Sequence, residues 1–138
     1  MASVSVDLPS LRPDAGPNPS ASLYERLGGH TGIAQITRSI IRNHLANPQV
    51  SARYEAVVDM PRVERHVVEF FCAGAGGPES YTGKEMIDAH RGMNVSEQEF
   101  AAVVDDALAA LDEHRIDAGT RNEVLGIMWS LKGEIVRR

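Results

Sequence analysis

The spacing of the apolar residues limits the fold of this chain more than any other feature. Apolar side chains recur every three or four positions in several long stretches, of which residues 100–111 form the clearest. No stretch shows sustained alternation at every second position. A repeat of about 3.6 residues places apolar side chains on one face of an α-helix, whereas a half-buried β-strand needs a repeat of two. The sequence therefore predicts an all-α domain.

Capping residues and helix breakers divide the chain into helices. A short helix is predicted to begin at Ser22, which can form a capping box with Glu25, and to end at Gly28-Gly29. A brief segment with Met86 and His90 is predicted to be closed by Gly92. The longer helices are predicted to run from Thr31 to Asn47, from Asp59 to Gly74, from Ser96 with Glu99 as capping partner, and from Thr120 with Glu123 as partner.

Composition narrows the class of protein. The first 21 residues hold four of the seven prolines and no helical or strand period, so residues 1–21 are predicted to be a flexible tail before one domain at 22–138. The formal charge of −5 lacks the basic excess that nucleic-acid binding needs. No apolar run could span a bilayer and no signal peptide is evident, so we expect a cytoplasmic protein without a membrane partner. Cys72, the single cysteine, excludes an intramolecular disulfide or a multi-cysteine metal cage.

Histidine is the residue type that points to chemistry. The sequence has five histidines and no nucleophile elbow or phosphate-binding loop. His30, His44 and His114 have polar neighbours, so we expect them to face solvent or the rim of the domain. His66 and His90 are flanked by apolar residues at helical spacing, which predicts an interior position. A buried neutral imidazole is either a hydrogen-bonded core residue or a metal ligand, and spacing alone leaves both possibilities open.

Three strings resemble the truncated haemoglobins of group I. They are Leu23-Tyr24-Glu25-Arg26-Leu27-Gly28-Gly29, Val58-Asp59-Met60, and Tyr81-Thr82-Gly83-Lys84-Glu85-Met86 followed by Ala89-His90. The resemblance covers about residues 22–136. It implies a truncated globin fold: a two-over-two helical sandwich around one haem b, in which the second and third helices pack against the last two.

The resemblance also implies roles for individual residues. His90 matches the proximal histidine that bonds the haem iron, and His66 matches a histidine that is an internal sixth ligand in some members. Arg62 and Lys84 are expected to pair with the haem propionates, and Tyr54 and Met86 to pack on the porphyrin. The remaining expected lining residues are Ile41, Val63, Val67, Phe70 and Met128.

The distal residues depart from the usual pattern of the family. Ile41 stands where a tyrosine commonly donates to bound dioxygen, and Val63 and Val67 stand where glutamine is common. His66 is then the polar side chain expected over the iron. The haem is expected to be non-covalent, because there is no Cys-x-x-Cys-His and because Leu131-Lys132-Gly133 lacks the haem-linking histidine of some relatives.

The sequence is compatible with three functions. The chain is expected to be a haem protein that binds O2, NO or CO, with an internal histidine ligand and redox or nitric-oxide-related chemistry. As an enzyme resembling a nitric oxide dioxygenase it would need a reductase as partner. The alternatives are a non-catalytic bis-histidine protein for electron transfer or for redox or gas sensing, and a helical interaction module without haem.

Overall fold

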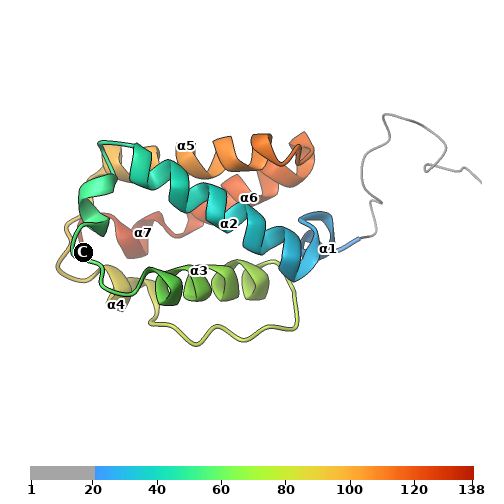
Figure 1. Ribbon diagram of the computed structural model, residues 1–138, viewed down its shortest axis with the longest axis horizontal. Coiled ribbons are helices and arrows are strands. Elements are labelled where there is room, and N and C mark those ends of the chain that lie inside the picture. Colours follow the sequence, from blue (N-terminus) through green and yellow to red (C-terminus); the bar gives the residue numbers. More distant parts are fainter. Residues whose placement is uncertain (1–20) are drawn as a thin grey trace, which may run out of the picture.

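The computed structural model describes residues 21–138, which form a helical domain (Figure 1). Residues 1–20 of the predicted tail lie outside the described residues. Within residues 21–138 the only β-type pairing is an isolated bridge between Val95 and Val136, so the all-α prediction is confirmed. In chain order the elements are α1 (Leu23–Arg26), α2 (Gly29–Ala46), the 3₁₀ helix η2 (Ser51–Tyr54), α3 (Met60–Gly74), α4 (Met86–His90), α5 (Glu97–Glu113), α6 (Ala118–Ser130) and α7 (Lys132–Ile135). None of these described helices has the length and hydropathy to cross a bilayer.

Two predicted capping boxes differ in how completely they form. At α1 the Ser22 hydroxyl accepts from the Glu25 amide at 3.1 Å, and the Glu25 carboxylate accepts from the Ser22 amide at 2.9 Å. At α5 the Ser96 hydroxyl accepts from the Glu99 amide at 3.0 Å, but the Glu99 carboxylate binds the Arg53 guanidinium instead of the Ser96 amide. The helix starts are therefore as predicted, while one reciprocal bond is replaced by a contact to a distant residue.

The predicted start of α2 at Thr31 is wrong, because the helix begins at Gly29. Gly28 takes a left-handed backbone angle, with φ of 96°, and turns the chain directly from α1 into α2. Gly32 lies so close to the preceding turn that a Cβ there would sit 2.3 Å from the Leu27 carbonyl oxygen. Glycines at these positions thus permit a turn that leaves no room for a separate cap at Thr31.

The predicted cap of α6 at Thr120 is also wrong. Asp117 caps this helix, accepting from the Thr120 amide at 3.1 Å and from the Thr120 hydroxyl at 2.7 Å. Thr120 is fully buried, and its hydroxyl also accepts from Arg26 of α1 at 3.1 Å. Glu123, the expected capping partner, forms an ion pair with Arg26. The Thr-x-x-Glu signature therefore marks a contact between α1 and α6 rather than a capping box.

Two layers of helices enclose the core. Figure 1 shows α2 crossing the domain, with α5 and α6 on one side and α3 on the other, and α2 contacts both α3 and α5. The core is formed by apolar side chains from all four of these helices, among them Ile33, Ile36, Ile40, Val68, Cys72, Phe100, Val104, Ala107, Leu111, Val124 and Met128. The short α4 contacts α7 near the C-terminus.

Helix α3 divides its apolar residues between this core and a second face. It begins, as predicted, with Asp59 accepting from the Arg62 amide at 3.1 Å. Its buried residues are Val68 and Cys72. The face predicted to be apolar and interior is only half-buried, and it comprises Val63, His66, Val67, Phe70 and Phe71. Phe71 also packs against the helical core, whereas Val63, Val67 and Phe70 do not, so this part of the face is available to contact another group.

Candidate haem site

His90 ends α4 in a state suited to ligating a metal. Its Nδ1 lies 2.8 Å from the carbonyl oxygen of Met86, one turn earlier. A carbonyl oxygen can only accept, so Nδ1 carries the proton and Nε2 keeps its lone pair. In ligating histidines generally, a hydrogen bond from the ring nitrogen that does not bind the metal fixes the tautomer and the orientation of the ring. The structure therefore fits the role of haem ligand that the resemblance implies for His90.

His66 has a partner that the sequence analysis missed. We expected a purely apolar surrounding, yet its Nδ1 lies 3.3 Å from Oε1 of Glu69, and the ring meets Tyr81 edge-on at 6.2 Å. Its side chain remains 23% exposed. The signal was present in the sequence, since residues three apart share a helix face. With Nδ1 donating to a carboxylate, Nε2 of His66 is also left with its lone pair.

Glu69 links His66 to the loop before α4. The Thr82 hydroxyl and amide donate to the same Oε1 of Glu69, at 2.7 and 3.0 Å. These Thr82 bonds, followed by the smaller influence of His66, hold the pKa of the Glu69 carboxyl below its usual range. The carboxylate is therefore ionised at neutral pH and orients the imidazole above it.

The half-buried face of α3 is lined by aromatic contacts. Phe70 meets Phe71 edge-on at 6.2 Å and Tyr81 edge-on at 5.4 Å. Val63 and Val67 lie on the same half-buried face. The structure thus brings His66, Phe70 and Tyr81 together, and this face offers flat and branched apolar groups of the kind that pack on a porphyrin.

The other predicted lining residues lie in different surroundings. Ile41 and Met128 are buried, and Met86 is half-buried at the start of α4. Arg62 and Lys84 are exposed, and neither takes part in an ion pair within residues 21–138. Their cationic groups are thus available to the acidic propionates of a haem, as the resemblance implies.

The prediction that His44 faces the rim is wrong. His44 is 5% exposed, its Nδ1 lies 2.8 Å from Oδ2 of Asp106 on α5, and its ring stacks on Tyr54 at 5.9 Å. Burial, and then the charge of Asp106, raises the pKa of Tyr54. The carboxylate partner lies on a distant helix, so the polar neighbours of His44 in the sequence gave the wrong indication. His114 is half-buried rather than solvated, with Nε2 2.9 Å from the Ser39 hydroxyl, whereas His30 is exposed as predicted.

Comparisons with known proteins agree with this geometry. The family model described as bacterial-like globin matches residues 22–137. A group 1 truncated haemoglobin of Mycolicibacterium paratuberculosis is 33% identical over 115 residues, which cover 83% of this chain and 84% of that protein. A group 1 truncated haemoglobin of Tetrahymena pyriformis is 28% identical over 111 residues, covering 80% of this chain and 91% of the relative.

Solved structures confirm the fold. The crystal structure of the truncated haemoglobin from Tetrahymena pyriformis in its Fe(III) form superposes with a TM-score of 0.81 at 25% identity, covering 86% of this chain and all of that one. The 2/2 haemoglobin from Synechococcus, whose haem is covalently attached, gives a TM-score of 0.78 at 24% identity with the same coverage of this chain. The two-over-two prediction is therefore confirmed, and haem is the cofactor that this fold carries. The chain belongs to the bacterial-like globin family, among the truncated haemoglobins of group 1.

Proposed function

We propose that this protein binds small diatomic gases at a haem held by His90, and that His66 is the internal sixth ligand in at least the ferric state. One observation carries the proposal: in both histidines Nδ1 is engaged by an acceptor of the chain, Met86 or Glu69, so both Nε2 atoms are free to ligate. When bound, haem supplies an iron that takes diatomic ligands and exchanges electrons.

The distal residues support gated rather than long-lived ligand binding. Ile41, Val63 and Val67 have no hydrogen-bond donor in their side chains. A donor to a charged acceptor is worth about 1.5–3 kcal/mol. Its loss corresponds to a roughly tenfold to hundredfold faster release of a ligand such as oxygen, relative to a globin with a distal tyrosine. An external ligand must in addition displace the His66 imidazole from the iron, and the hydrogen bond to Glu69 holds this imidazole in place.

These features favour redox chemistry with nitric oxide or nitrogen oxides over oxygen storage. Catalytic conversion of nitric oxide would require a reductase as partner. The second candidate is a non-catalytic bis-histidine protein for electron transfer or sensing, and the bond between Glu69 and His66 supports it by fixing the imidazole. Nitrate formation from nitric oxide and oxygen over many turnovers, with an artificial electron donor, would favour the catalytic function. A single turnover would favour the second candidate.

The sixth ligand is tested by absorption spectroscopy of the ferric protein at neutral pH. We expect a low-spin spectrum for the wild type, a high-spin spectrum for His66→Leu, and faster carbon monoxide binding to the ferrous His66→Leu variant. The matched control is His114→Ala. It removes the histidine that follows α5 and contacts Ser39 of α2, and this variant should remain low-spin. A high-spin wild type, or a His66→Leu variant that stays low-spin, would rule out this ligand.

A further inference from the structure

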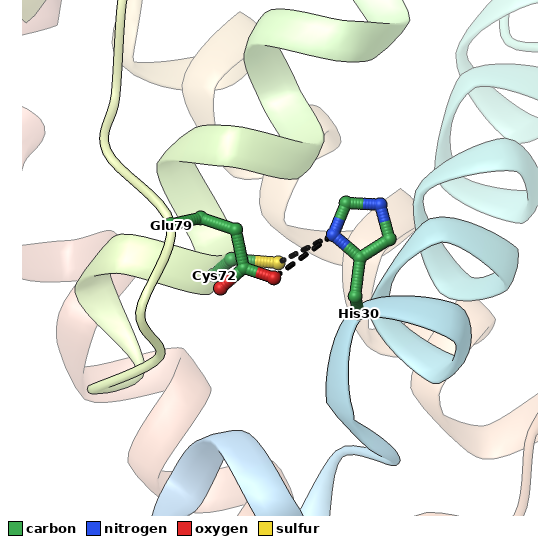
Figure 2. A group of neighbouring side chains, drawn as sticks. All are labelled: His30, Cys72 and Glu79. Carbon is green, nitrogen blue, oxygen red and sulfur yellow. Dashed lines mark hydrogen bonds and ion pairs between the residues drawn. The ribbon is translucent and has the colours of Figure 1, made fainter.

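A second group of metal-ligating side chains lies at the C-terminal end of α3. His30 on the first turn of α2, Cys72 near the end of α3, and Glu79 in the following loop point toward one another (Figure 2). His30 Nδ1 lies 2.9 Å from Oε2 of Glu79 and 3.9 Å from Sγ of Cys72, and one ligand atom from each residue lies within 4.8 Å of the others. Cys72 belongs to the fully buried side of α3, whereas His66 belongs to its half-buried face. The cluster is therefore separate from the haem site.

The carboxylate of Glu79 provides an independent indication of a ligand. Its Oε2 accepts from the Tyr24 hydroxyl at 2.9 Å and contacts His30. Its Oε1 is buried and has no hydrogen-bond partner within residues 21–138. Buried polar atoms nearly always have a partner, and an unpaired one calls for an explanation such as an ion. Figure 2 shows that one oxygen of Glu79, Oε2, faces His30, while Oε1 points away, so a cation among these three side chains would supply the missing partner by binding both oxygens of the carboxylate.

The observed distances are close to those of a tetrahedral zinc site. Zinc bond lengths give about 3.5 Å between a sulfur and a nitrogen ligand, and about 3.4 Å between nitrogen and oxygen. The corresponding distances here are 3.9 and 2.9 Å. These two pairs therefore need shifts of about half an ångström, and the sulfur of Cys72 lies within 4.8 Å of the carboxylate oxygen of Glu79. The His30 side chain is 58% exposed, so it can move and can admit an ion from solvent.

The backbone around the cluster holds the ligands in place. A Cβ at Gly77 would lie 2.5 Å from the Tyr24 ring and 2.6 Å from Oε1 of Glu79, so only glycine leaves room for this pair. The Gly77 amide donates to the Cys72 carbonyl at 2.8 Å, which fixes the loop against the end of α3. Tyr24 orients the carboxylate from outside, as partners of metal ligands commonly do.

We propose that His30, Cys72 and Glu79 bind one divalent transition-metal ion, for which Zn²⁺ is the best match. A thiolate and a carboxylate together neutralise a charge of +2, and sulfur with imidazole selects a borderline-soft metal over Mg²⁺ or Ca²⁺. Three protein ligands leave a fourth position for water on the exposed side of His30. The ion would join α2, the end of α3 and the loop that leads to α4.

The proposal is tested on the full-length, haem-loaded protein, in which His90 is assigned to iron; His66, which carbon monoxide displaces, lies beside Glu69, so a sulfur-ligated metal is distinguished from one bound there. Equilibrium dialysis should show one Zn²⁺ retained per chain. The ferrous carbon monoxide form, which is diamagnetic, should give one ¹¹³Cd resonance in the range of mixed sulfur, nitrogen and oxygen ligation. His30→Ala should weaken zinc binding at least tenfold without changing haem content, because His30 is exposed. Cys72→Ser should abolish the sulfur-ligated ¹¹³Cd signal.

His114→Ala is the matched control, since His114 is also a histidine beside a carboxylate, that of Glu113, but has no thiol nearby. This variant should bind zinc like the wild type. No zinc retained by the wild type, equal retention by His30→Ala, or a ¹¹³Cd resonance without sulfur ligation would each overturn the proposal. If Cys72→Ser fails to fold, the His30→Ala comparison and the wild-type ¹¹³Cd resonance still decide.

Discussion

Replacing Asp106 tests whether a buried polar contact fixes α2 to α5. The Asp106 carboxylate accepts from Nδ1 of His44 at 2.8 Å and from Nδ2 of Asn47 at 3.2 Å. The side chains of His44 and Asp106 are 6% and 13% exposed. In Asp106→Ala the donor of His44 is left buried and unpaired, at a cost of about 1.5–3 kcal/mol for a bond to a charged group. Asn47 can bind water instead, so it adds at most about 1 kcal/mol.

We therefore expect Asp106→Ala to lower the free energy of unfolding by about 1.5–4 kcal/mol, out of a typical 5–15 kcal/mol. Urea unfolding of the haem-free protein, followed by circular dichroism, measures this change. Asp105→Ala removes the neighbouring exposed carboxylate and should change stability by less than about 0.5 kcal/mol. A double-mutant cycle with His44→Leu should give a coupling of about 1–3 kcal/mol. Equal stability of the two aspartate variants, or a coupling near zero, would refute the assigned contact.

Three further predictions concern the haem, the thiol and the loop. Acidified butanone should extract all the haem, because residues 131–133 carry no haem-linking histidine, and haem left on the protein would show a covalent bond. Burial, and then Glu79, raises the pKa of Cys72 to about 11, so in zinc-free protein its reaction with a thiol reagent at pH 7 should be at least about a hundredfold slower than that of a free cysteine. A comparable rate would contradict the buried position. Because the Thr82 hydrogen bonds lower the pKa of the Glu69 carboxyl, the contact between the two residues should persist as the pH falls and be lost only below about pH 4.3. The amide resonance of Thr82 follows this loss in a pH titration. A midpoint at or above about pH 4.3, the usual value for a glutamate, would contradict the bond.

Local signals in the sequence were sufficient for most of the fold. The capping serine at residue 22 and the Asp59-Met60-Pro61 start of α3 act through neighbouring amides, so a short stretch of sequence contains the whole interaction. The predicted starts of α2 and α6 were wrong for a different reason. Gly28 permits a left-handed turn that starts α2 before Thr31, and Asp117 accepts from the Thr120 amide and so starts α6 one turn before the cap predicted at Thr120.

The site was predictable only where it rests on a recognised motif. His90 and its bond to Met86 lie within one helical turn, and the strings around them resemble a known family. The partners of His44 and of the cluster around Cys72 come from residues far away in the chain, such as Asp106 and Glu79. Hydrophobic periodicity carries no information on such contacts, because they depend on how the helices pack.

The most direct test of the account is the ligation of haem by His90. His90→Gly removes the imidazole and leaves a space for free imidazole to enter. We expect this variant to retain little haem after gel filtration, and to recover both haem content and the wild-type absorption spectrum when imidazole is added. His66→Gly, with a change of the same size on α3, should keep its haem without imidazole. Unchanged haem content and an unchanged spectrum in His90→Gly without imidazole would contradict the account.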